Sequence, residues 1–359
     1  MPATGRLATV HVADLDLAPN EASGLLGVQR PELLREHGWD LAFWSVLDEV
    51  DVGECLVLLG HRFGQELRSG WDAVRVPTAR TGDAGRADDA ESIAHHDGWV
   101  YAFGSQHGGK DGPIRRREQW VARFREADVG AARSPVELAV VRTPFLLHRL
   151  VNDALRTSDV DVLPMGDATR RAFIGQILPE LAGTSDAAMV RADDWTINVE
   201  GAEFLDDGTL LLGLRYPVAA DGRPLLVGLR GCGRLFDGGT PEVIGIWPVD
   251  AVGRGGIIAG IRDLCVVGST LHVVTGNLDS KGKGSVLLAD HPEGLNTVNT
   301  HFEVDLGGGR NRLTGRAVRE FPEHPRIEGL AADDGGRFFY VSDENATVHL
   351  RCTPLMTEG

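Results

Sequence analysis

Five polar residues recur at one position of a short repeated cassette, and their types and spacing could build a chemical site. In each copy an aliphatic residue precedes the polar residue, and a small residue or Asp and then an apolar residue follow it. The five polar residues are Ser23, Glu91, Glu200, Arg262 and Glu328. Equivalent positions of a repeat converge on one axis when the repeat units close into a ring, as the blades of a β-propeller do around their central channel. The cassettes therefore predict one polar site assembled from distant parts of the chain.

The glutamates of this set predict a metal site. Residues two apart on a strand share a face, so Asn198 is expected to accompany Glu200 toward the axis. Glu91, Glu200 and Glu328 would repel one another in a narrow channel unless positive charge neutralised them. Ca²⁺ takes several oxygen ligands and accepts irregular geometry. We therefore expect Ca²⁺ to be held by Glu91, Glu200, Glu328 and Asn198.

Two alternatives to the metal remain open at this point. Arg262 stands at the fourth cassette position and Arg326 two residues before the last one, so arginines could satisfy the carboxylates without an ion. A glutamate followed by glycine can also serve structure alone, by accepting backbone N–H bonds that join adjacent repeat units. The cassettes are thus a stronger signal for fold than for ligand.

If the protein is an enzyme, the sequence favours metal-assisted hydrolysis of a small ester, lactone or phosphoester at the channel mouth. The ion would polarise a carbonyl or phosphoryl oxygen, and a neighbouring carboxylate or His107 would act as base. The candidate catalytic residues are Glu91, Glu200, Glu328, His107 and Arg262. The sequence has no G-x-S-x-G elbow, H-E-x-x-H or C-x-x-C motif. A propeller that binds a small molecule or protein without catalysis, or a specialised enzyme of secondary metabolism, is the alternative.

A second polar layer follows the second strand of each repeat. Its residues are Asp48, Glu49, His107, Arg215, Asn277, Asp343 and Glu344. We expect the loops that carry them to open on the face opposite the cassette residues. The Gly-rich stretch 104–110, which contains His107, is followed by three arginines and is read as a hairpin tip with solvated charges.

Turn signals and apolar runs after each cassette predict short strands and an all-β fold. The expected strands are 40–46, 55–60 and 71–78; 99–104, 120–125 and 136–142; 209–215, 224–230 and 243–249; 270–275, 285–289 and 301–306; and 337–341 and 347–352. The last repeat has one expected strand fewer than the others. Residues 7–15 alternate between apolar and polar side chains and form an expected strand that belongs to no repeat. Pairing of this N-terminal strand with the last repeat would close a β-propeller and remove its exposed edges.

The number of blades depends on the long interval between the second and third cassettes. Apolar residues at helical spacing in 144–190, such as Leu147, Val151 and Leu155, predict a helical insertion there. We favour five blades in one domain spanning 1–359, with six as the alternative. A short helix is expected from Pro31 to Gly38. The insertion either lids the channel or covers a blade flank.

Bulk composition restricts the partners that this chain can have. The formal net charge of −16 argues against general binding of nucleic acid and of anionic membranes. The N-terminus shows no signal peptide, and the four cysteines lie far apart without metal-type spacing. We expect a reduced, cytoplasmic protein whose partner is a small molecule in the central channel.

The cassettes also carry a resemblance. The segments 198–202, 260–264 and 327–331, together with 91–94 and 104–107, are similar to N-I-E-G-L-A and G-I-R-D-L repeats of an uncharacterised bacterial β-propeller family. The chain is more distantly similar to phytase-like propellers with esterase-like activity. This resemblance covers most of residues 20–350 and implies a propeller, Ca²⁺ in the channel and ester hydrolysis. Ala202 and Glu203 depart from the family pattern, which has Leu-Ala there.

Overall fold

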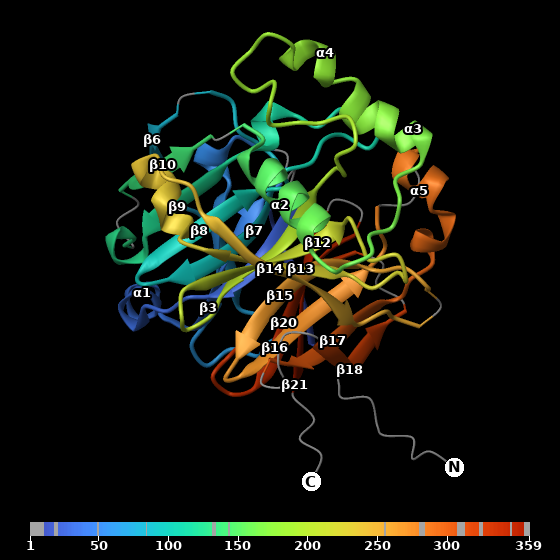
Figure 1. Ribbon diagram of the computed structural model, residues 1–359. Coiled ribbons are helices and arrows are strands. Elements are labelled where there is room, and N and C mark those ends of the chain that lie inside the picture. Colours follow the sequence, from blue (N-terminus) through green and yellow to red (C-terminus); the bar gives the residue numbers. More distant parts are fainter. Residues whose placement is uncertain are drawn as a thin grey trace, which may run out of the picture.

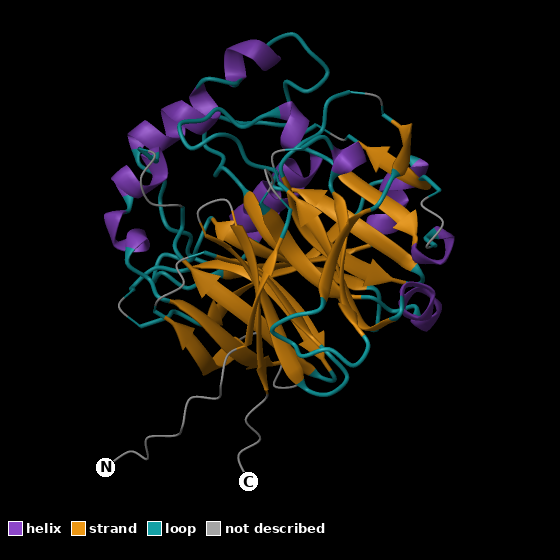
Figure 2. Ribbon diagram, turned by 180° about the vertical axis from the view of Figure 1, so that it is seen from behind, coloured by secondary structure: helices purple, strands orange, loops and turns teal. Residues whose placement is uncertain are grey.

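A computed structural model describes residues 11–17, 21–48, 50–83, 85–130, 134–142, 144–254, 256–279, 284–306, 313–322, 326–344 and 347–354. Within these residues the fold is all-β, as the sequence predicts. The helices α2 to α5 gather over one side of the strands (Figure 1). Seen from behind, a run of helices borders the strands on one side, and shorter helical segments lie beside the strands on the other (Figure 2).

Each cassette begins an antiparallel unit of four strands, because the apolar runs that follow it pair in chain order. The units are β2 (Ala22–Gly27), β3 (Trp39–Leu47), β4 (Leu56–Arg62) and β5 (Trp71–Arg75); β7 (Ala90–His96), β8 (Trp99–Gly104), β9 (Val121–Arg125) and β10 (Val136–Val141); β11 (Asn198–Phe204), β12 (Thr209–Tyr216), β13 (Leu225–Arg230) and β14 (Glu242–Asp250); β15 (Gly260–Val267), β16 (Thr270–Gly276), β17 (Asn299–Asp305) and β18 (Leu313–Phe321); and β19 (Ile327–Ala332), β20 (Arg337–Glu344), β21 (Thr347–Pro354) and β1 (His11–Leu15).

The first strands of these units, β2, β7, β11, β15 and β19, form a closed cycle of contacts. Each of them touches the next, and β19 returns to β2. We call them the inner strands. The third cassette position is small where neighbouring backbones meet. A Cβ on Gly201 would lie 3.2 Å from Cα of Asp263, and one on Gly24 would lie 3.2 Å from Cα of Ser92. Close approach of the inner strands thus explains the glycines at this position, whereas the fourth cassette has Asp263 there.

The N-terminal strand completes the last unit, as the sequence predicts. β1 pairs antiparallel with β21, with Val12 opposite Arg351 and Leu15 opposite Val348. The predicted strand began at residue 7, and residues 7–10 lie outside the described part of the chain. Leu15 is buried in the same core cluster as Leu350. This strand covers the edge that β21 would otherwise expose.

The predicted insertion is helical. It holds α2 (Leu146–Thr157), α3 (Asp167–Arg170), a π-helical turn at Arg171–Gly175 and α4 (Leu178–Leu181). Leu147, Val151 and Leu155 of α2 pack on the core between the second and third units. The predicted short helix is α1 (Pro31–His37), and it ends at Gly38 in the left-handed conformation, with φ of 71°.

Three elements differ from the sequence-based prediction. Residues 285–289 are not a strand: α5 (Val286–Asp290) lies there, and Ser285 caps it by accepting a hydrogen bond from the N–H of Leu288 at 3.1 Å. The outer strand of the fourth unit is β18 instead. An extra strand, β6 (Thr78–Gly82), pairs in parallel with β10. The third and fourth units are also joined, by a short parallel pairing of Val249 and Asp250 of β14 with β18.

Candidate functional site

One cavity of about 520 Å³ collects every residue that the sequence singled out as catalytic or metal-binding. Those residues are Glu91, Glu200, Glu328, Asn198, His107 and Arg262. Ser23, the remaining polar cassette residue, lines it as well. The cavity therefore lies where the inner strands begin.

Irregular strand pairing explains how the cassette residues reach this cavity. The ladder between the first and second strands shifts register at the cassette in every unit. In four units the polar cassette residue is the one that the shift leaves without a partner across the ladder. A bulge of this kind turns a side chain away from its regular position. Sequence alternation alone does not reveal it.

Three residues of the second polar layer line the same cavity and Asn277 does not, so the expected placement on the opposite face is wrong for these three. Asp48, His107 and Arg215 are all in the cavity wall. The reason is the antiparallel pairing of the first two strands, which puts the end of the second beside the start of the first. Ala90, for example, pairs with Gly104, and Asn198 with Tyr216. Glu49 lies outside the described residues.

Buried arginines hold two of the three predicted glutamates. Glu200 receives Nη1 of Arg215 at 2.6 Å and lies 3.0 Å from Nη1 of Arg262. Arg262 also binds Glu328 through Nη2. Asn198 donates from Nδ2 to Glu200 at 3.2 Å. Burial and the neighbouring Arg215 lower the pKa of Arg262 to about 10, which still leaves it charged at neutral pH.

The predicted ligand set therefore divides into two groups. Glu200, Glu328 and Asn198 belong to the arginine network. Glu91 instead stands with Asp48 and Asp89, whose candidate ligand oxygens all lie within 4.8 Å of one another. Asp89 is held by the hydroxyl of Ser105, which donates to its carboxylate, and it adopts a left-handed backbone with φ of 66°. We call Asp48, Asp89 and Glu91 the acidic trio.

The acidic trio is costly to keep ionised without a cation. Burial raises the pKa of Glu91 well above its usual range, and Glu200, Asp48 and Asp89 raise it further. Burial likewise raises the pKa of Asp89, with the charges of Asp88 and Glu200 adding to the effect. Like charges close together disfavour the ionised forms. The trio must bind protons or a cation.

His107 is fixed from outside the units by the helical insertion. Its Nδ1 lies 3.0 Å from Oγ1 of Thr196, and its ring stacks on Phe173 with 4.7 Å between ring centroids. Burial lowers the pKa of His107 to about 4, so the imidazole is neutral at neutral pH. A neutral imidazole can accept a proton.

The loop of residues 105–118, which carries His107, is therefore no solvated hairpin tip. The backbone N–H of Ile114 donates to the carbonyl of Phe173 at 3.2 Å, and Arg116 pairs with Asp186. Both partners belong to the insertion. The insertion thus contacts a loop of the cavity wall in addition to covering the third unit.

Glu118 ends this loop as a buried acid of the cavity wall. Its Oε1 receives Nη1 of Arg115 at 3.2 Å, and Nε of Arg117 lies 3.8 Å away. Burial nevertheless raises the pKa of Glu118 to about 8, with the charge of Asp89 adding to the rise. Most of this carboxyl group is therefore protonated at neutral pH.

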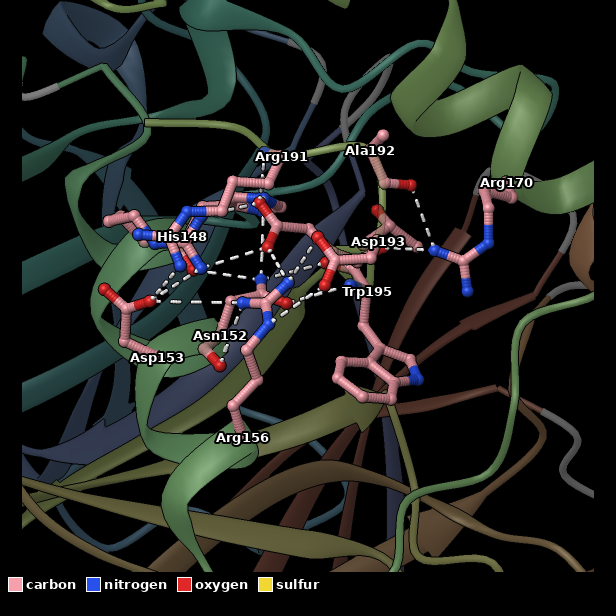
Figure 3. Close-up of polar contacts among 12 residues, drawn as sticks. His148, Asn152, Asp153, Arg156, Arg170, Arg191, Ala192, Asp193 and Trp195 are labelled. Carbon is pink, nitrogen blue, oxygen red and sulfur yellow. Dashed lines mark hydrogen bonds and ion pairs between the residues drawn. The ribbon is translucent and has the colours of Figure 1, made fainter. Parts of the chain in front are cut away.

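A buried salt-bridge network ties the insertion together. Asp194 is fully buried and receives both terminal nitrogens of Arg149, at 2.9 and 3.0 Å, and Nη2 of Arg156 at 2.6 Å. His148, Asn152 and Arg156 project from α2 toward the segment that contains Asp193 and Trp195 (Figure 3). Thr196, the contact of His107, follows directly in this segment.

Sequence reasoning missed three residues of this region. Arg215 was noted, but not as a partner of Glu200. Glu118 stands in no recognisable motif. Asp263 follows the arginine of the fourth cassette and performs the structural task that the sequence allotted to glutamates: its carboxylate accepts backbone N–H bonds from Leu25 and Leu330, on two other inner strands. An Asp where the other cassettes have Gly or Ser was the available signal.

Comparison with known proteins finds no matching family model and no matching curated protein. Among solved structures, Pseudomonas fluorescens PhoX in complex with vanadate is 11% identical, with a TM-score of 0.45 over 93% of this chain and 88% of that one. The GH43 endo-arabinanase from Bacillus licheniformis is 10% identical, with a TM-score of 0.41 over 94% and 95% of the two chains. The mannose phosphorylase MPT-4 from Leishmania mexicana is 10% identical, with a TM-score of 0.43 over 98% and 89%. These values assign no activity or ligand to this chain.

No helix in the described part of the chain combines the length and apolar character that crossing a membrane requires.

Proposed function

We propose that the five units are blades of one propeller and that the chain is a hydrolase of small esters, lactones or phosphoesters, dependent on a divalent cation. The acidic trio carries this proposal, because it gathers three hard oxygen donors in a cavity that also contains a neutral imidazole. Ca²⁺ and similar cations prefer such donors. The proposed ligand set retains Glu91 and has Asp48 and Asp89 in place of Glu200, Glu328 and Asn198.

The charge of the cavity supports a cation. Its described lining holds nine carboxyl groups and seven arginine or lysine side chains. Because Glu118 is mostly protonated at neutral pH, the other eight carboxylates leave an excess of one negative charge. A divalent cation would neutralise this excess and reduce the repulsion that adds to the effect of burial on the pKa values of Asp89 and Glu91. A cation bound there supplies Lewis acidity and lowers the pKa of a bound water.

The remaining residues fit the other parts of a hydrolytic reaction. His107 can accept a proton from a water molecule, because it is neutral and held by Thr196. Glu118 can donate a proton to the leaving oxygen, because its carboxyl group stays protonated at neutral pH. Arg262 and Arg215 are fixed by Glu200, so they present positive charge without reorganisation when a substrate oxygen becomes negative.

The test is metal content and metal response in the wild type and in Glu91→Gln. We expect Ca²⁺ or Mn²⁺ in the purified protein, a rise in melting temperature on adding the ion, and an affinity for the ion at least about tenfold lower in Glu91→Gln. Glu66→Gln, at an exposed surface pair with Arg68, is the control. Metal-free protein without a thermal response to either ion, and without ester, lactone or phosphoester hydrolysis, would refute the proposal.

A non-catalytic binding propeller is the second candidate, and the arginine network favours it. Glu200 and Glu328 already have arginine partners, so this half of the cavity is stable without an ion. This candidate predicts ligand binding that is indifferent to metal. It also predicts that Glu200→Gln changes stability and leaves any response to metal unchanged.

A further inference from the structure

The wall of the cavity is mostly polar. Its described lining consists of charged or polar side chains and two glycines, without an aliphatic or aromatic side chain. Pockets for small molecules are ordinarily lined mostly by apolar groups. A ligand with an alkyl or aryl portion would therefore bury that portion against charges and gain little from doing so. The ligand that fits must carry polar groups over most of its surface.

Two buried oxygen atoms of the wall, one on Asn198 and one on Glu118, lack a hydrogen-bond partner. Asn198 is 8% exposed, and its Nδ2 donates to Glu200, which fixes the amide so that Oδ1 is the atom left over. Glu118 is 3% exposed, and its Oε2 is unpaired while Oε1 binds Arg115. A buried polar atom without a hydrogen-bond partner is costly, so a ligand that supplies the partner is favoured.

The cationic residues of the wall decide which donor is suitable. Arg215 and Arg262 lie in the same network as Asn198, and Arg115 and Arg117 flank Glu118. These guanidinium groups would repel the ammonium group of an amine. A hydroxyl group donates a hydrogen bond without adding positive charge. A hydroxyl group also accepts a hydrogen bond, so it can donate to Oδ1 of Asn198 and pair with Oε2 of Glu118 whether that carboxyl group is protonated or ionised. Hydroxyl groups therefore suit both oxygen atoms.

We infer that the ligand of this cavity is a small polyhydroxylated compound, such as a polyol or sugar derivative, whose hydroxyl groups bind Oδ1 of Asn198 and Oε2 of Glu118. The inference rests on the proposed function for the bond that reacts, a lactone or phosphoester. The recognition of hydroxyl groups depends on the cavity wall alone. It can therefore hold even if the proposed hydrolysis fails.

The test compares probes that differ only in hydroxyl groups. Calorimetry would compare sorbitol phosphate with hexyl phosphate, and glucono-δ-lactone hydrolysis would be compared with δ-hexalactone hydrolysis, each with and without Ca²⁺. We expect the hydroxylated member to bind, or to react, at least about tenfold better, because a site built for a hydroxyl group rejects the analogue that lacks it. Sorbitol phosphate binding without hydrolysis would refute the proposed function and keep this inference.

Substitutions at Asn198 and Glu118 test which residue causes the preference for hydroxylated probes. Asn198→Ala is expected to reduce the preference for the hydroxylated probe at least about threefold. Glu118→Gln, which keeps an acceptor oxygen, should retain more of the preference than Glu118→Ala. Thr209→Val removes another buried unpaired oxygen that is outside the cavity wall, and it controls for stability. Equal binding of hydroxylated and plain probes to wild-type protein, or binding of neither, overturns the inference without any variant.

Discussion

Asp263 joins three inner strands at their closest approach. Its carboxylate accepts the backbone N–H of Leu25 at 3.3 Å, of Leu264 at 2.8 Å and of Leu330 at 2.6 Å. Asp263→Ala leaves these buried donors without an acceptor. We expect it to lower the free energy of unfolding by about 3–5 kcal/mol, measured by urea denaturation.

Asp159→Ala, at an exposed position after α2, is the control and should change the free energy of unfolding by less than about 0.5 kcal/mol. Asp263→Asn keeps one acceptor oxygen and should fall between the two. Equal stability of the two alanine variants would show that Asp263 does not join the strands.

Glu203 makes the stability of the protein depend on pH. Burial raises its pKa from 4.5 to about 7, against the opposing effect of the N–H groups of Phe204 and Val266. The folded state therefore holds the proton more tightly than the unfolded state. The contribution is fully present below about pH 4.5 and is lost as the pH rises through about 7.

Glu203→Gln removes this ionisation and keeps an acceptor oxygen. Relative to the wild type, its free energy of unfolding should be about 1–2 kcal/mol higher at pH values above about 7, and should show no gain below about pH 5. Urea denaturation over this pH range checks the expectation. An unchanged difference at every pH would contradict the assigned cause.

At the scale of elements, the insertion holds the loop of residues 105–118 in place in the cavity wall. Asp194 compensates Arg149 and Arg156 inside the insertion, and the same segment carries Thr196 to His107. Asp194→Asn leaves buried guanidinium groups without full compensation, which typically costs about 3–5 kcal/mol. We expect faster hydrogen exchange in α2 and in residues 105–118, with β12 and β13 still protected.

Asp193→Asn provides a matched control at the next position. Asp193 also pairs with Arg156, at 3.0 Å, but its side chain is 73% exposed. An exposed pair contributes about 0–1 kcal/mol, so hydrogen exchange should hardly change. Faster hydrogen exchange throughout the β-sheets of Asp194→Asn would mean that the insertion unfolds together with the core and not separately from it.

Elements with a strong local pattern could be predicted from the sequence, and elements without one could not. The strands after each cassette have apolar runs between turn signals, and α2 has helical periodicity. Residues 285–289 have a short apolar run that fits either a strand or a helix, and only the cap by Ser285 decides for α5. β18 is mostly exposed, so it lacks the apolar pattern on which strand prediction depends.

The residues of the candidate site could likewise be predicted from the sequence only where a local pattern marks them. The cassette residues were predictable because repetition places equivalent residues at equivalent sites. The choice between a metal and arginines was not, because it depends on the distances from Glu200 to Arg215 and Arg262, which lie 15 and 62 residues away in the chain. The pairing of Glu91 with Asp48 likewise depends on how β7 packs beside β3.

For the whole molecule, we expect closure of the ring to depend on β1, which completes the last unit. This strand covers the edge of β21, and Leu15 and Leu17 bury their side chains in the core of the last unit. Removal of the first 17 residues should expose the β21 edge, lower the melting temperature and cause self-association through that edge. Size-exclusion chromatography and thermal unfolding measure both effects.

Leu15→Ala removes the packing of one β1 side chain in the core but leaves the backbone of β1 in place on β21. It should cost about 2–3 kcal/mol but leave the backbone pairing of β1 with β21 intact, so the protein should stay in the association state of the wild type. A synthetic peptide of residues 5–17 should restore that state to the truncated chain, because it can pair with the same edge. If the truncated chain keeps the melting temperature and elution volume of the wild type, β1 does not close the ring, and the stability of the ring must come from the inner-strand contacts alone.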